Sequence, residues 1–254
     1  MTTAKGKLYL VPAPLDFGCE QHASLHDVMP QQTLQIAARL GCFICENAKS
    51  TRAYLKRVGE LVPLGQQVQA LQIQELPREV HKKGDHTGNF DARPLLKAAL
   101  DGHDIGLVSE AGMPAIADPG SSVVRAAHDL GIEVIALTGP MSLMLALASS
   151  GLNGQNFAFV GYLPQDAGER SQRIKALESL ALKTGQTQIF IETPYRNAAL
   201  LQALLQSLQG NTRLALSCGL TLDTAWTKSA TVAKWKQDKP APPLGLPTVF
   251  CLGR

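Results

Sequence analysis

The chain has 254 residues, of which 45% are hydrophobic and 18% are charged, and its formal net charge is +3. A chain of this length and composition can bury one large core or two smaller ones, which excludes disordered and collagen-like proteins. The longest weakly polar run, residues 141–152, is shorter than the roughly 20 apolar residues of a membrane-spanning helix, so we expect no membrane partner.

Charge and cysteine usage narrow the class of protein further. Residues 1–138 contain 13 basic and 15 acidic side chains, whereas residues 139–254 contain 11 and 6, a balance of +5. This basic half suits a polyanion and equally an ordinary solvated surface.

The odd number of cysteines, together with an N-terminal apolar stretch broken by two prolines, predicts a cytoplasmic protein. Cys42 and Cys45 fall in a predicted strand, and no histidine pair has ligand spacing on a predicted helix, so we expect no metal.

In the first half, short apolar runs alternate with amphipathic segments, which predicts an α/β domain with a parallel sheet. The expected strands are residues 7–11, 42–45, 105–109 and 133–137. The expected helices are residues 31–40, 50–58, 91–100 and 121–130. The last of these is the clearest, because Asp118 and Pro119 supply a helix cap and a first-turn proline, and Gly131 ends it.

The second half has more strands than helices, which predicts a mixed sheet. The expected strands are residues 157–162, 188–192, 213–218, 227–232 and 248–252, and the expected helices are residues 141–150, 169–180 and 194–208. A Gly-Pro turn at residues 139–140 separates the two patterns. We therefore expect two domains, residues 1–138 and residues 139–254.

Two segments have irregular patterns. Residues 60–89 are rich in glutamine and contain two prolines, which predicts either a loop that closes over a substrate or a surface insertion. Four prolines at positions 240, 242, 243 and 247 precede the last strand. Because proline has no N–H to donate, we expect this strand at a place in the sheet where few backbone N–H groups must pair with a neighbouring strand.

Four loops of small residues follow predicted strands, at residues 11–18, 109–120, 138–142 and 192–196. Ligands of open α/β sheets bind beyond the carboxyl ends of the strands, where these loops lie. The loop at residues 109–120 is the strongest candidate, because Gly112 permits a close backbone approach and only Glu110 and Asp118 carry charge. For Asp118, helix capping alone is also a sufficient explanation. The sequence contains neither G-x-G-x-x-G after the first strand nor a P-loop, which disfavours dinucleotide and nucleoside triphosphate enzymes.

The order of these loops resembles that of the tetrapyrrole (corrin/porphyrin) methylase superfamily, and most closely its 16S ribosomal RNA 2′-O-ribose methyltransferase branch. The motifs are L-Y-L-V-P at residues 8–12, S-E-A-G-M-P-x-I-A-D-P-G at 109–120, G-P-x-S-L-M at 139–144, G-Y-L-P at 161–164 and E-T-P-x-R at 192–196.

The resemblance implies an enzyme of two α/β domains that uses S-adenosyl-L-methionine, held in the cleft between them, and that forms a homodimer. It implies ribosomal RNA or the small ribosomal subunit as partner. By the same resemblance the cofactor contacts residues in four loops, namely Pro12, Ser109, Ala111, Gly112, Met113, Pro114, Ile116, Met141, Ser142, Ile191 and Glu192.

If the acceptor is a ribose hydroxyl, a base must take its proton. Glu46 and Glu110 are the catalytic candidates, because each follows a predicted strand on the same edge of the sheet. The branch has T-P-I-G-N-L where this chain has A-P-L-D-F-G at residues 13–18, and E-D-T-R where it has E-N-A-K at residues 46–49. A small-molecule (tetrapyrrole) methyltransferase and a non-catalytic cofactor- or RNA-binding paralogue therefore remain alternatives.

Overall fold

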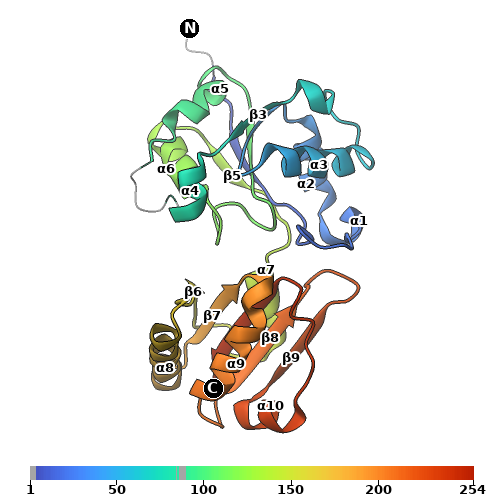
Figure 1. The fold of residues 1–254 in the computed structure, drawn as a ribbon. Coiled ribbons are helices and arrows are strands. Elements are labelled where there is room, and N and C mark those ends of the chain that lie inside the picture. Colours follow the sequence, from blue (N-terminus) through green and yellow to red (C-terminus); the bar gives the residue numbers. More distant parts are fainter. Residues whose placement is uncertain (1–3, 84, 86–89) are drawn as a thin grey trace. The chain divides into compact units, whose positions relative to one another are not determined.

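The computed structural model describes residues 4–83, 85 and 90–254, and the chain forms two compact units (Figure 1). Unit 1 comprises residues 1–18 and 23–140, and unit 2 comprises residues 19–22 and 141–254. Among the described residues, no helix is long and apolar enough to cross a bilayer.

The sheet of unit 1 is entirely parallel, as predicted, and has five strands in the order β3-β2-β4-β1-β5. The strands are β1 (Leu8–Val11), β2 (Cys42–Cys45), β3 (Gln72–Glu75), β4 (Ile105–Val108) and β5 (Val134–Ala136). Val108 pairs in register with both Val11 and Cys45, so β1, β2 and β4 end at one level. The loops that follow these three strands therefore start side by side.

Helices cover both faces of this sheet (Figure 1). They are α1 (Leu25–Val28), α2 (Gln31–Arg39), α3 (Ala48–Gly59), α4 (Arg78–Lys83), α5 (Lys97–Leu100) and α6 (Ser121–Asp129), with 3-10 turns η1 (Val68–Ala70) and η2 (Arg93–Leu96). Adjacent strand residues point to opposite faces. Phe43 accordingly packs with α2 and α3 in one core, whereas Ile44 packs with α6 in the other.

The structure corrects the predictions for two segments of unit 1. Residues 60–89 are not one irregular loop, because they contain η1, the edge strand β3 and α4; positions 84 and 86–89 lie outside the described residues. The helix expected at residues 91–100 is a 3-10 turn followed by only four α-helical residues. Pro94 lies in the first turn of η2, where a helix tolerates proline, so this residue does not account for the short α-helix.

The sheet of unit 2 is mixed, as predicted, with strand order β6-β7-β10-β8-β9. Its strands are β6 (Phe157–Tyr162), β7 (Thr187–Glu192), β8 (Arg213–Cys218), β9 (Trp226–Thr231) and β10 (Thr248–Gly253). The β6–β7 pair is parallel and the other pairs are antiparallel. The expectation for the last strand was wrong, since β10 lies in the centre between β7 and β8. All four prolines precede β10, so every residue of the strand itself keeps its N–H donor.

Two cores lie on opposite faces of this second sheet. Helix α7 (Ser142–Ser150) covers one face, while α8 (Ala167–Thr184), α9 (Asn197–Ser207) and α10 (Val232–Asp238) cover the other; η3 (Pro194–Arg196) precedes α9. On the α8–α10 side, the rings of Phe190 and Phe250 stack with centroids 5.7 Å apart.

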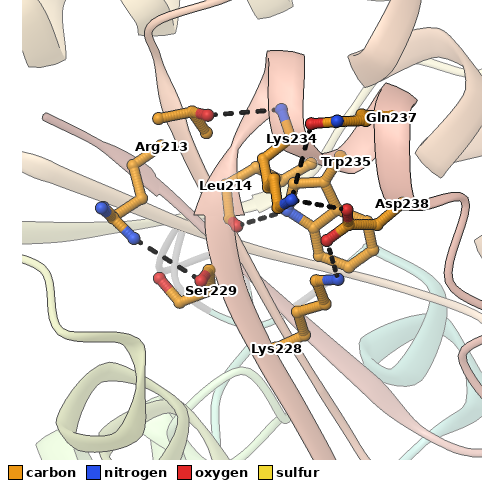
Figure 2. Close-up of polar contacts among 9 residues, drawn as sticks. Arg213, Leu214, Lys228, Ser229, Lys234, Trp235, Gln237 and Asp238 are labelled. Atoms are coloured by element: carbon orange, nitrogen blue, oxygen red, sulfur yellow. Dashed lines mark hydrogen bonds and ion pairs between the residues drawn. The ribbon is translucent and has the colours of Figure 1, made fainter.

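Helix α10 is fixed to the sheet by its buried tryptophan (Figure 2). The indole N–H of Trp235 donates to the carbonyl oxygen of Leu214 at 2.8 Å, and Lys228 and Lys234 both pair with Asp238. Sequence patterns did not predict α10, because it is only seven residues long.

Candidate functional site

Two of the predicted loops are joined directly by backbone hydrogen bonds in unit 1. The N–H of Ala13 donates to the carbonyl oxygen of Gly112 at 2.9 Å, and the N–H of Gly112 donates back to Ala13 at 3.0 Å. This reciprocal pair holds the loop after β1 against the loop after β4. Pro12 and Gly112 therefore lie close together.

A third loop, which follows β5, packs against the same place. A Cβ built on Gly139 would lie 2.2 Å from Cγ of Pro12, so only glycine allows this approach. A Cβ built on Gly112 would lie 3.6 Å from the carbonyl oxygen of Pro140. The hydroxyl of Tyr54, on α3, donates to the carbonyl oxygen of Pro12 at 3.1 Å. The loops after β1, β4 and β5 thus converge at the carboxyl edge of the sheet.

The loop at residues 109–120 has an unusual backbone. Ala115 and Ala117 both have φ of 65°, and Gly112 and Gly120 also have positive φ. A left-handed conformation costs a residue with a Cβ roughly 1–2 kcal/mol, and such residues cluster at functional sites. Within this loop Ser109 and Pro114 are buried, Ala111 and Met113 are half-buried, and Ile116 is 41% exposed.

The capping prediction for Asp118 was wrong. The residue that precedes α6 is Gly120, and the carboxylate at this helix start belongs to Asp85. This carboxylate accepts hydrogen bonds from the N–H groups of Gly120 (3.0 Å) and Ser122 (2.8 Å). It also accepts from the hydroxyls of Ser121 and Ser122. Burial disfavours the ionised form of Asp85, but these hydrogen bonds outweigh it and lower its pKa. Asp85 is distant in sequence, so no local pattern could identify it as the cap.

Asp118 instead belongs to a group of carboxylates. Burial, and then the negative charges of Glu46 and Glu110, raise the pKa of Asp118 to about 7. Glu46 directly follows β2, and its Oε1 lies 3.4 Å from the backbone N of Glu110, which follows β4. The hydroxyl of Ser50 donates to Oε1 of Glu110 at 3.1 Å. The two predicted candidates therefore lie together, and Asp118 is the member that sequence reasoning missed.

A buried ion pair holds the chain that leaves the first loop. Arg57, on α3, donates through both terminal nitrogens to the carboxylate of Asp16, at 3.1 and 3.0 Å, and the N–H of Ala23 donates to the same group at 3.0 Å. Asp16 is 2% exposed. It stands where the resemblance led us to expect a different motif, and in this chain it joins Ala23 to Arg57 of α3.

The remaining predicted residues belong to unit 2. Met141 and Ser142 begin α7, and Leu143 of that helix packs in the same core as Ile191 of β7. Glu192 is buried at the end of β7, where Oε1 accepts from the N–H (2.7 Å) and hydroxyl (3.1 Å) of Thr193 and Oε2 accepts from Arg196. Its carboxylate therefore holds the turn after β7.

Comparisons with known proteins identify the family of this chain. The family model described as Tetrapyrrole (Corrin/Porphyrin) Methylases matches residues 27–234. The chain is 32% identical over 215 residues to the "Ribosomal RNA small subunit methyltransferase I" of Mesorhizobium japonicum. The aligned region covers 84% of this chain and 63% of that protein. It is 31% identical over 214 residues to the protein of the same name from Vibrio cholerae, with 84% and 65% covered. The chain thus spans less than two thirds of the length of these relatives.

Solved structures show the same fold. The methyltransferase CobJ superposes with a TM-score of 0.57 at 17% identity, covering 98% of this chain and 94% of that one. The uroporphyrin-III-C-methyltransferase of Thermus thermophilus superposes with a TM-score of 0.54, at the same identity and coverage.

Proposed function

This chain belongs to the tetrapyrrole (corrin/porphyrin) methylase family, and on that premise we propose that it is an S-adenosylmethionine-dependent methyltransferase whose substrate is a ribose 2′-hydroxyl of ribosomal RNA. The names of the relatives support the substrate class. The observation that carries the proposal is the convergence of three loops, two of them linked by backbone hydrogen bonds, beside three carboxylates at the carboxyl edge of the unit 1 sheet.

The residues at this edge fit the methyl donor by charge and by shape. S-adenosylmethionine, when bound, supplies a methyl group from a positively charged sulfonium, and the sulfur becomes a neutral thioether when the methyl group is transferred. Glu46 and Glu110 supply negative charge close to the loops, which favours a cation in a partly buried setting. Gly112 and Gly139 have no side chain at the contact between the loops, which lets the three loops pack this closely.

We assign the donor contacts to both predicted domains, residues 1–138 and residues 139–254. Pro12, Gly112, Met113, Pro114 and Ile116 would bind it from the first domain, with Ser109 and Ala111 shaping the same loop. Met141, Ser142 and the strand end at Ile191 would bind it from the second. Glu192 would act by holding its turn, since its carboxylate oxygens already accept hydrogen bonds.

The carboxylates give the chain a route for the proton of the acceptor hydroxyl. Methyl transfer is an in-line displacement that mainly needs alignment, and a positioned base adds about 10²- to 10⁴-fold. Glu46 and Glu110 are the proposed acceptors, and Asp118 would share the proton because its pKa of about 7 lies near the working pH. Exchange among the three groups would keep one of them ready to accept.

A transfer assay tests this proposal. The protein is incubated with methyl-labelled S-adenosylmethionine and small ribosomal subunits from a strain that lacks the enzyme. We expect label in the RNA, on a ribose that resists alkaline cleavage afterwards. Label found only on a tetrapyrrole precursor would establish the small-molecule alternative, and absence of label from every acceptor would favour a non-catalytic paralogue.

Two further features belong to the same proposal. A ribosomal RNA substrate implies a cytoplasmic enzyme, and the family resemblance implies a homodimer. Light scattering of the purified chain tests the second point, for which we expect twice the mass of one 27.2 kDa chain.

A further inference from the structure

Two exposed tyrosines lie at neighbouring strand ends of unit 2. Tyr162 is the last residue of β6 and pairs in register with Ile191, while Tyr195 lies in the turn that follows β7. Their exposed fractions are 56% and 82%, the highest of the large apolar and aromatic side chains in the described part of the chain. Rings with this much exposed surface contribute little apolar burial to the core.

A bulge in β6 sets the direction of Tyr162. Phe159 pairs with Ile189 and Tyr162 pairs with Ile191, so three steps along β6 match two along β7. The extra residue falls beside Gly161, whose φ of 73° suits a bulge. Cross-strand partners share a face, so the bulge puts Tyr162 on the face of Ile191, one position later than a regular strand would.

Arg196 directly follows Tyr195 in η3. Arg196 donates to the buried carboxylate of Glu192, which also fixes Thr193, so the guanidinium is held in place. The hydrogen bond to Glu192 raises the pKa of Arg196 against the opposing effect of desolvation, and charge interactions with Tyr195 and Tyr162 add to the rise. Glu192 occupies one of the terminal nitrogens, which leaves other N–H donors of Arg196 for a ligand.

We infer that Tyr162, Tyr195 and Arg196 form a platform on which an unpaired base of the RNA substrate stacks. The inference rests on the proposed function and adds how the substrate is held. Proteins that bind single-stranded RNA stack splayed bases on aromatic rings and on arginine planes. The balance of +5 in residues 139–254 is compatible with a polyanionic ligand. A duplex offers no free base face, so the platform should prefer single strands.

Binding of a fluorescein-labelled single-stranded RNA of mixed sequence, measured by anisotropy with the full chain, tests this inference. Loss of one stacking ring weakens binding by about 5- to 150-fold. We therefore expect such a loss for Tyr195→Ala and for Tyr162→Ala, and affinity within about twofold of the parent for Tyr195→Phe, which keeps the ring. The slope of affinity against salt should stay unchanged, because no phosphate contact is removed.

Phe157→Ala is the matched control. Phe157 is also an exposed aromatic residue of β6, at 40%, but it begins the strand, about 16 Å from Tyr162 at 3.3 Å per residue. It should bind the RNA as the parent does. Equal loss in Phe157→Ala and the tyrosine variants would overturn the inference, and so would tyrosine variants that change the oligomeric state while binding RNA normally.

Failure of the inference and failure of the proposed function give different results. If the parent chain binds and methylates RNA and the tyrosine variants bind it equally well, the platform is wrong and the function stands. If the parent chain binds no RNA while methylating a tetrapyrrole, the proposed function fails and the platform fails with it. Donor binding, measured by calorimetry, should be unchanged in all variants.

Discussion

Gly139 lies against the ring of Pro12 so closely that a Cβ at position 139 would fall 2.2 Å from Cγ and 2.6 Å from Cβ of the proline. The contact joins the loop after β5 to the loop after β1. Gly139 and Pro12 both belong to unit 1, and each lies in a loop that is proposed to touch the methyl donor.

Gly139→Ala should therefore lower the free energy of unfolding by about 1–3 kcal/mol, the usual cost of overpacking, and weaken donor binding in the same variant. Urea denaturation and calorimetry measure the two effects. Gly154→Ala is the control, because a Cβ at position 154 meets no atom within 4 Å. Stability of Gly139→Ala equal to that of the control would contradict the close packing.

The Asp16–Arg57 pair should contribute more than an exposed ion pair, because the two side chains are only 3% and 24% exposed. Removing one partner of a buried pair costs about 3–5 kcal/mol. We expect a double-mutant cycle with Asp16→Asn and Arg57→Met to give a clear coupling energy. The same cycle on Lys97 and Asp101, which are 76% and 51% exposed, should give about 0.3–0.5 kcal/mol. Equal coupling in the two cycles would show that the pair does not hold the loop.

Asp118→Asn should change the pH dependence of stability. The pKa of this carboxyl is 3.8 in the unfolded chain and is raised to about 7 in the folded chain. Its contribution to the free energy of unfolding is therefore fully present below pH 3.8 and is lost as the pH rises through about 7. The amide does not titrate. The increase in the free energy of unfolding of Asp118→Asn over the parent should thus be smallest near about pH 4 and largest near about pH 8. Its upper limit is about 4 kcal/mol, at about 1.4 kcal/mol per unit of pKa shift. A gain that is independent of pH would refute the raised pKa.

Glu110→Gln tests the proton acceptor. The amide keeps the shape of the side chain and can still accept from Ser50, so the loop should retain its fold. We expect turnover to fall by about 10²- to 10⁴-fold while the dissociation constant of the donor stays within about twofold. Equal losses in turnover and in donor binding would assign Glu110 to donor binding instead. Glu46→Gln serves as the parallel variant for the second candidate.

Much of the fold could be predicted because its signals are local. The runs at residues 42–45, 157–162 and 213–218 became strands with the predicted bounds, and α6 ends beside Gly131 as expected. The prediction failed where tertiary contacts decide. Strand β3 has no apolar alternation, since it is an exposed edge strand that gains its order by pairing with β2. The central place of β10 depends on strand pairing, which the prolines before it do not reveal.

The site was predictable in outline for a similar reason. Small residues after strands mark loops at a sheet edge, and the structure brings Pro12, Gly112 and Glu110 of unit 1 to that edge. Which carboxylate caps α6 depends on Asp85, more than thirty residues earlier in the chain. Once Asp85 takes that role, Asp118 becomes available for the carboxylate group, a relationship that appears only in three dimensions.

The central claim is that the donor binds to the main chain of the converging loops. Titration of ¹⁵N-labelled protein with S-adenosylmethionine, followed by amide chemical shifts, measures this most directly. The account predicts saturable shifts concentrated in residues 12–16 and 109–118, and their loss in Gly139→Ala but not in Gly154→Ala. Saturable shifts confined to other segments, with these loops unmoved, would contradict it.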